Sequence, residues 1–99
     1  MPKHELEQKL EDRCVAKIEA LGGMALKLSI PGVRGFPDRL VFLAGCRVWA
    51  PEFKRLKTGR ASAQQYEWKR RLAAVDVNMI FIDTDAQFDA ALEKELAHG

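Results

Sequence analysis

The side chains best suited to chemistry in this chain are two carboxylates and a lysine. Asp38 and Glu52 each stand seven residues from Gly45. If the chain reverses at Gly45, antiparallel pairing sets the two carboxylates opposite one another, with Cβ atoms roughly 5 Å apart. Lys54 follows two residues after Glu52, and the strand period of two puts its ammonium on the same face. Two acids this close repel each other unless a divalent cation lies between them, so the pattern indicates a metal site.

A β-hairpin is the element that must position these side chains. Two apolar runs, Arg39 to Ala44 and Arg47 to Phe53, are rich in Val, Leu, Phe or Trp and have a glycine between them. This arrangement is typical of a hairpin. Pro51 directly precedes Glu52 and cannot donate a ladder hydrogen bond. A bulge at Pro51 would shift the pairing of the two acids by one residue, and we expect a local distortion there.

The same residues resemble a known nuclease signature. Pro37-Asp38 followed by Glu52-Phe53-Lys54 resembles the P-D…(D/E)-x-K pattern of the PD-(D/E)xK nuclease superfamily. Within it, the chain is similar along nearly its whole length to the VRR-nuclease family (virus-type replication-repair nucleases). That similarity is carried by Glu7, Gly22-Gly23, Lys27, Gly35-x-Pro37-Asp38, Glu52-x-Lys54 and Ser62-x-x-Gln65.

The resemblance implies an α/β fold with a restriction-endonuclease-like core and a single VRR-nuclease-like domain over residues 1–99. It implies a metal-dependent DNA endonuclease that uses Mg²⁺ or Mn²⁺. Standalone members of the family look like homodimers that act on branched DNA, including four-way junctions. So small a domain offers little surface for reading base sequence, which also favours structure-selective cleavage. A viral or mobile-element origin is a further implication.

The resemblance also assigns roles. Asp38 and Glu52 hold the metal with the backbone carbonyl of Phe53, and Lys54 orients or activates the attacking water. Glu7 joins directly or through water. Gln65 and Lys27 position water or phosphate. Two other hypotheses stay open, a DNA-binding module without catalysis and a structural domain whose acids merely pair with nearby cations.

The first helix is expected over residues 4–21, ended by Gly22-Gly23. Its buried stripe is Leu10, Cys14, Ile18 and Leu21. Glu7 falls inside that stripe, where a carboxylate needs a partner. Its placement in the first turn offers a structural explanation, since acids there favour the helix dipole. Glu11, at the edge of the stripe, is the alternative helix acid.

The remaining pattern predicts the order α-β-β-β-α-β-α, a small mixed sheet flanked by helices. Strands are expected at Met24 to Ile30 and Asn78 to Ile82. Ser62 and Gln65 form a capping box that begins the second helix, which leaves open whether Gln65 also serves the site. A second capping box, at Thr84-x-x-Gln87, begins the last helix, lined by Phe88, Leu92 and Leu96. We assign Tyr66, Trp68 and Leu72 to packing, and Asp83, Asp85 and Asp89 to structural roles.

Positive charge is concentrated in the middle of the chain. From Lys27 to Arg71 there are 11 lysines and arginines against 3 acids, a net charge of +8, while the remainder carries −6. A basic segment of this kind suggests a surface that binds a polyanion. The residues assigned to nucleic-acid contact are Lys27, Arg34, Arg39, Arg55, Lys57, Arg60 and Lys69.

Composition excludes several other classes. No apolar run approaches the ~20 residues of a membrane span, and the charged N-terminus does not resemble a signal peptide. The two cysteines form no CxxC motif and lie near no histidine, so neither a zinc site nor a disulfide scaffold is indicated. We expect a cytoplasmic protein, in a bacterial host if the origin is viral.

Overall fold

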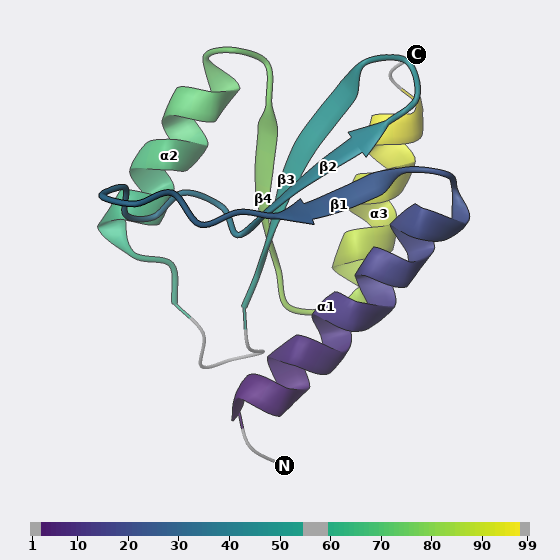
Figure 1. The fold of residues 1–99 in the computed structure, drawn as a ribbon, viewed down its shortest axis with the longest axis horizontal. Helices are drawn as coiled ribbons and strands as arrows, with labels where there is room; N and C mark the ends of the chain where they lie inside the picture. The colour runs from purple at the N-terminus through teal and green to yellow at the C-terminus, as the bar shows by residue number, and fades with distance from the viewer. Residues whose placement is uncertain (1–2, 55–59, 98–99) are drawn as a thin grey trace.

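The computed structural model describes residues 3–54 and 60–97, which form helices and strands in the predicted order. The elements are α1 (Lys3–Ala20), β1 (Met24–Lys27), β2 (Arg39–Leu43), β3 (Arg47–Phe53), α2 (Ala63–Ala73), β4 (Asn78–Ile82) and α3 (Asp85–Ala97) (Figure 1). In this part of the chain, none of the helices has the length and apolar character needed to cross a membrane.

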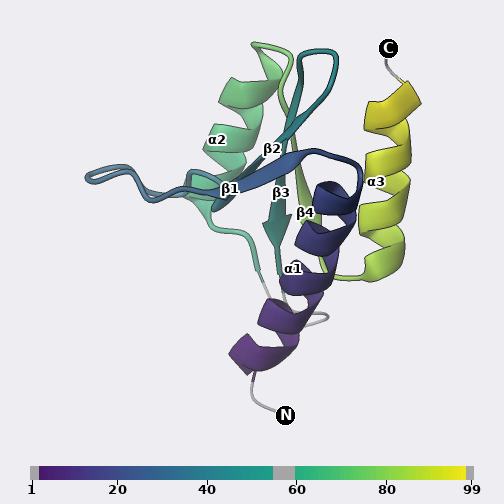
Figure 2. The same cartoon turned by 45° about the vertical axis from the view of Figure 1, so that its right-hand side comes forward.

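The sheet is small and mixed, as the sequence predicted. Its strand order is β1-β2-β3-β4, with β1, β2 and β3 antiparallel in turn and β4 parallel to β3. Helices α1 and α3 lie on one face of the sheet and α2 on the other (Figures 1 and 2). The chain therefore has an α/β fold with helices on both faces of a mixed sheet.

The main core fills the space between the sheet and the α1–α3 face. Trp49 of β3 is fully buried, and its ring lies 5.5 Å from that of Phe88 of α3. Phe53 stacks on the same Phe88 ring. The α1 stripe contributes Leu10, Cys14 and Ile18, all buried as predicted. Burial of these large side chains is the main source of stability for the fold.

Two predictions at the start of the fold are wrong. Leu21 is 52% exposed, because α1 ends at Ala20 and the helical spacing no longer applies. Strand β1 ends at Lys27 rather than Ile30, where its pairing with β2 stops. Gly23 explains the tight turn before β1, since a Cβ there would lie 2.8 Å from the Phe42 carbonyl oxygen.

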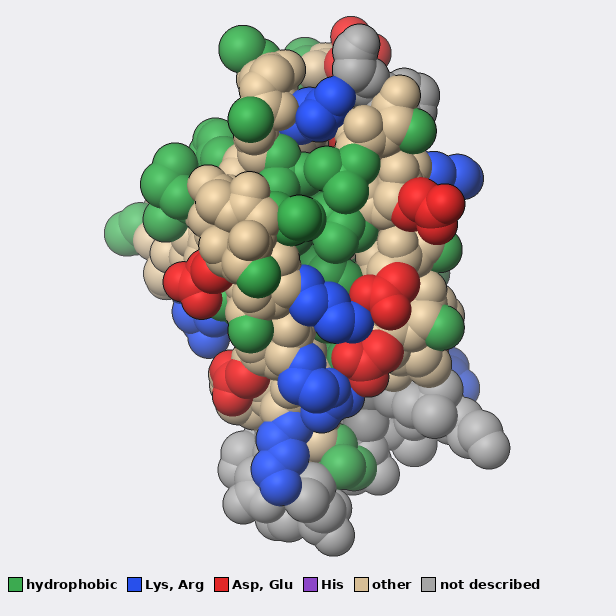
Figure 3. All heavy atoms as spheres, turned by 90° about the vertical axis from the view of Figure 1, so that its right-hand side faces the viewer, with side chains coloured by type: hydrophobic (Ala, Val, Ile, Leu, Met, Phe, Trp, Pro, Cys, Tyr) green, Lys and Arg blue, Asp and Glu red, His purple; other side chains and the backbone are tan. Residues whose placement is uncertain are grey.

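Ion pairs join α1 to α3 across the surface. Arg13 binds both carboxylate oxygens of Asp85, and Lys17 binds Asp89 at 2.7 Å. Figure 3 shows basic and acidic side chains meeting between the two helices. The structural roles predicted for Asp85 and Asp89 are thus confirmed. Leu96, predicted to line α3, is 41% exposed near the end of that helix.

Candidate active site

The hairpin brings Asp38 and Glu52 together as the spacing predicted. Its paired residues, symmetric about Gly45, are Val41 with Trp49, Phe42 with Val48, and Leu43 with Arg47. Continuing this register places Asp38 opposite Glu52. The backbone N–H of Asp38 donates to Glu52 Oε1 at 3.3 Å. The two acids therefore lie side by side where β2 begins and β3 ends.

Pro51 does not shift this register. The described pairing of β2 with β3 ends at Trp49, two residues before the proline. On its other side, β3 pairs regularly with β4, including Pro51 with Ile80 and Glu52 with Phe81. Asp38 and Glu52 therefore keep the position that the register gives them. The only irregularity in the described β2–β3 pairing is that it stops at Trp49, before Pro51.

Glu52 is buried while Asp38 is exposed at the surface beside it. Glu52 is only 4% exposed. Burial raises its pKa to about 7, and the nearby charge of Asp38 also raises it, while the Lys54 ammonium opposes the change. Holding an ionised carboxylate here is unfavourable without a cation, because desolvation and a like charge act in the same direction. The site is therefore suited to a positive ligand.

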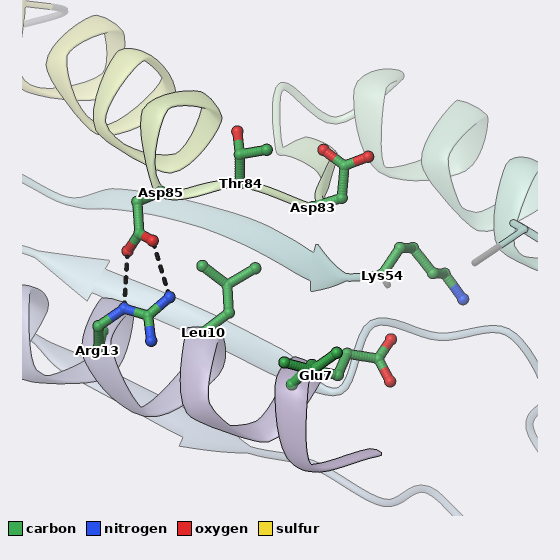
Figure 4. A pocket seen from close by; sticks show the side chains of 8 residues that line it. Glu7, Leu10, Arg13, Lys54, Asp83, Thr84 and Asp85 are labelled. Carbon is green, nitrogen blue, oxygen red and sulfur yellow. Dashed lines mark hydrogen bonds and ion pairs between the residues drawn. The ribbon is translucent and has the colours of Figure 1, made fainter. Parts of the chain in front are cut away.

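Lys54, two residues after Glu52, lines a cavity of about 440 Å³ between α1 and the ends of β3 and β4. Its backbone N–H donates to the Ile82 carbonyl at 2.7 Å, which fixes the chain directly after Glu52. Glu7 of α1 lines the same cavity, and Figure 4 shows the side chains of Glu7 and Lys54 extending toward the same side of it. The other lining residues are Leu6, Leu10, Arg13, Asp83, Thr84 and Asp85.

Glu11, the alternative helix acid, forms an ion pair with Arg39. Its Oε2 binds Arg39 Nε at 2.6 Å, and the two side chains are only 10% and 15% exposed. Arg39 also donates to the Ala25 carbonyl at 2.9 Å. Arg39 thus contacts α1 and β1 in this structure, and its assignment to phosphate stays a prediction. Glu7 remains as the helix acid that faces the cavity.

The other predicted phosphate contacts divide into three groups. Lys69 donates to the Met79 carbonyl and lies over the Phe81 ring, so its ammonium takes part in the packing of α2 on β4, and its assignment to phosphate stays a prediction. Lys27, Arg34 and Arg60 are exposed, which leaves their side chains accessible to a phosphate backbone. Arg55 and Lys57 lie outside the described residues.

Gln65 completes the capping box at the start of α2. Its backbone N–H donates to Ser62 Oγ at 3.1 Å, and its own Oε1 accepts from the Ser62 N–H at 2.9 Å. The structural prediction for this residue is confirmed. Its role at the site stays a prediction.

The loop that leads into Asp38 is held by α2. Trp68 Nε1 donates to the Arg34 carbonyl at 3.0 Å, and the Trp68 ring meets Phe36 edge-on at 4.9 Å. Gly35 lies against the helix at a φ of +81°, where an added Cβ would stand 2.5 Å from the Gln64 backbone. Helix α2 thus fixes the chain two residues before Asp38.

The donor set fits a cation that prefers oxygen ligands and keeps bound water. Within residues 3–54 and 60–97, no group of three or more His, Cys, Asp or Glu side chains is placed to hold a metal ion. Asp38 and Glu52 supply two carboxylates, and Glu7 lines the neighbouring cavity. Mg²⁺ is typically bound in this way, through one or two carboxylates with water and substrate oxygens.

Two residues near Lys54 were not identified from sequence. Asp83, assigned a structural role, and Tyr66, assigned to packing, line a second cavity together with Lys54. Asp83 follows β4 directly, and β4 is parallel to β3, so its position beside Lys54 follows from strand order. The sequence pattern alone does not give this strand order, so it could not place Asp83 beside Lys54.

Comparison with known proteins agrees with this geometry, although no family model matches the sequence. The chain is 32% identical over 78 residues to "Putative nuclease p44" of Acyrthosiphon pisum secondary endosymbiont phage 1, covering 79% of this chain and 83% of that protein. A solved structure described as a VRR_NUC domain matches with a TM-score of 0.81 and 28% identity, covering 89% of this chain and 95% of the other. The chain belongs to the VRR-nuclease family of the PD-(D/E)xK nuclease superfamily.

Proposed function

We propose that this chain is a metal-dependent endonuclease that hydrolyses phosphodiester bonds in DNA and selects branched structures. One observation carries the proposal. Glu52 is buried, accepts the backbone N–H of Asp38, and has a raised pKa beside a second carboxylate. A fold does not maintain such a pair for stability, because both burial and repulsion act against it.

In this proposal, Asp38, Glu52 and the Phe53 carbonyl hold Mg²⁺ or Mn²⁺. When bound, the metal lowers the pKa of a coordinated water and neutralises charge on the phosphate. The chain positions everything else. The N–H of Asp38 fixes the Glu52 carboxylate, and the Lys54 backbone contact with Ile82 fixes the chain after it.

The side chains around the pair have separate tasks. Lys54 orients the attacking water and stabilises negative charge that develops on the phosphate. Glu7 joins the metal directly or through a water molecule, and the cavity that it lines is also lined by Lys54. Gln65 positions water or phosphate from the first turn of α2. Lys27, Arg34 and Arg60 contact the DNA backbone and set its orientation.

We further propose that the chain acts as a homodimer on four-way junctions. Two sites related by a two-fold axis suit paired cuts across a junction of similar symmetry. The phage source of the nuclease relative supports a viral origin and action in a bacterial host's cytoplasm. Light scattering measures the dimer directly, and a monomeric mass at working concentration would contradict this part of the proposal.

The test is a cleavage assay on labelled four-way-junction, flap and linear duplex DNA, with Mg²⁺, Mn²⁺ or EDTA. The wild-type protein is compared with Glu52→Ala and with a control, Glu67→Gln, which alters an exposed acid paired with Arg70 on α2. We expect metal-dependent cuts in the wild type and the control, with the junction cut symmetrically and preferred over the linear duplex. The Glu52→Ala protein is expected to bind DNA without cutting it.

Two results would contradict the proposal. Normal cleavage by Glu52→Ala would show that the assigned site is wrong. If the wild type bound DNA but cut none of the substrates, the alternative of a non-catalytic binding module would replace the nuclease.

A further inference from the structure

A cavity of about 220 Å³ adjoins the proposed active site on its α2 side. Its lining residues are Lys54, Ala61, Tyr66, Phe81, Asp83 and Gln87. Lys54 and Asp83 also line the larger cavity that contains Glu7, and Figure 4 shows these two side chains at its α2 end. A ligand in the smaller cavity therefore lies next to the phosphate that Lys54 contacts.

Tyr66 presents an aromatic ring to this cavity. Its ring meets that of Phe81 edge-on at 5.3 Å, yet the residue is 57% exposed. The packing role inferred from sequence therefore uses only part of its surface. An exposed aromatic ring next to a phosphate-binding cation is the usual arrangement for stacking a nucleobase.

Asp83 offers a hydrogen-bond acceptor that the described part of the fold does not use. Its Oδ1 is buried and has no hydrogen-bond partner among residues 3–54 and 60–97. The start of α3 does not need it, because Thr84 Oγ1 caps Gln87 and the Asp83 N–H donates to Gln87 Oε1. An unsatisfied buried acceptor costs free energy, which rotation of the carboxylate toward a ligand N–H donor in the cavity would recover.

Resting on the proposed function, we propose that this cavity binds one unpaired nucleobase of the DNA, next to the phosphate that is cut. The base stacks on Tyr66 and donates an N–H from its pairing edge to the carboxylate of Asp83, which lines the cavity. Within a duplex, neighbouring bases cover the faces and the partner strand occupies the pairing edge, so only an unstacked, unpaired base presents both. The cavity would thereby favour branched DNA in which a base next to the branch is unpaired or becomes unstacked.

The test uses 2-aminopurine, a fluorescent base whose emission falls when it stacks on an aromatic ring. It is placed at each unpaired position beside the branch of a flap substrate, and a fully paired duplex of the same sequence serves as the control DNA. Binding is measured in Mg²⁺ with protein carrying Glu52→Ala, so that the DNA stays intact. Cleavage of the same DNA by the wild type is scored separately.

The substitutions at Tyr66 are made in this background. Tyr66→Phe keeps the ring, while Tyr66→Leu keeps apolar contact with Phe81 and removes the ring. We expect the emission to be quenched at one unpaired position, with the quenching retained in Tyr66→Phe and lost in Tyr66→Leu. Stacking energies of about 1–3 kcal/mol predict at least a fivefold loss of flap affinity for Tyr66→Leu, with duplex affinity unchanged. Asp83→Ala is expected to weaken flap binding alone, with its fold checked by circular dichroism.

Each other outcome is decisive. If the wild type cuts the flap but no position is quenched, or if Tyr66→Leu weakens flap and duplex equally, the base site is overturned and the nuclease stands. If quenching depends on Tyr66 but the wild type cuts nothing, the base site stands and the nuclease is overturned. Absence of DNA binding by the Glu52→Ala protein overturns the base site, and absence of both binding and cleavage by the wild type overturns the nuclease as well.

Discussion

Glu52 accepts the backbone N–H of Asp38 at 3.3 Å while its own side chain is only 4% exposed. One carboxylate is thus fixed by the backbone of the residue that carries the other. This contact holds the two acids together at the end of the hairpin. It also means that changes to either acid, or to the loop before Asp38, are expected to affect the same proposed metal site.

The raised pKa of Glu52 predicts how stability depends on pH without metal. Because the folded pKa is about 7 and the unfolded value is 4.5, the folded state binds more protons between these values. The contribution of Glu52 to the free energy of unfolding therefore falls as pH rises from about 4.5 to about 7 and is level above that. Glu52→Gln keeps an acceptor for the Asp38 N–H and removes the charge, so it is expected to be more stable at pH 8 by an amount on the order of 2 to 3 kcal/mol.

Urea unfolding in EDTA at pH 5 and pH 8 measures this difference. The two proteins should be nearly alike at pH 5 and diverge at pH 8, and Mg²⁺ should stabilise only the wild type. Equal stability of both proteins at pH 8 would show that the surroundings of Glu52 do not disfavour its charged form.

Glu7 and Glu11 are expected to respond differently to the same substitution. Glu11→Gln breaks a largely buried ion pair with Arg39, so we expect a loss of about 3 kcal/mol in unfolding free energy. Glu7→Gln should leave stability nearly unchanged and lower kcat, because its side chain faces the cavity. Melting curves measure the loss of stability, and single-turnover cleavage measures the loss of catalysis. If Glu7→Gln lost stability and Glu11→Gln lost only activity, the two assigned roles would be exchanged.

Gly35 is expected to be more sensitive than Gly32 to replacement by alanine. Both have positive φ, +81° and +77°, so both alanine variants share a backbone cost of roughly 1–2 kcal/mol. Only at Gly35 would the new Cβ also meet the Gln64 backbone, at 2.5 Å. Gly35→Ala should therefore lower the melting temperature further and weaken Mn²⁺ binding through Asp38. Matching behaviour of the two variants would mean that contact with α2 does not position the loop.

Lys54→Ala is expected to affect turnover more than metal binding. The ammonium is assigned to the water and the phosphate, so its loss should lower kcat by about a hundredfold or more. Because the ammonium also lowers the pKa of Glu52, Mn²⁺ affinity is compared at pH 8.5, which favours the ionised form of Glu52 in both proteins. A loss of Mn²⁺ affinity as large as the loss of kcat would place Lys54 in the metal site instead.

The local features of this fold were predictable because they depend on short spacings. The symmetry of Asp38 and Glu52 about Gly45 predicts their pairing, and Ser62 with Gln65 predicts the start of α2. The α1 stripe was correct up to Ile18 and wrong at Leu21, where the helix has already ended. Within one element, residue spacing determines which side chains share a face.

Contacts between distant elements were not predictable in the same way. Arg39 meets Glu11 28 residues away, and Lys69 reaches the Met79 carbonyl across the α2–β4 contact. Both were assigned to phosphate binding because a basic side chain in the sequence does not reveal its partner. The position of Asp83 beside Lys54 likewise depends on β4 pairing with β3.

Titration with Mn²⁺ measures whether Asp38 and Glu52 together hold a cation, as the proposed mechanism requires. Mn²⁺ is titrated at pH 8 into the wild type, Asp38→Asn, Glu52→Gln and the control Glu67→Gln, with bound metal followed by calorimetry and electron paramagnetic resonance. We expect one site of similar affinity in the wild type and the control, and a loss of at least tenfold in each of the other two. Undiminished binding by Asp38→Asn and Glu52→Gln would contradict the assignment of these two residues to the metal.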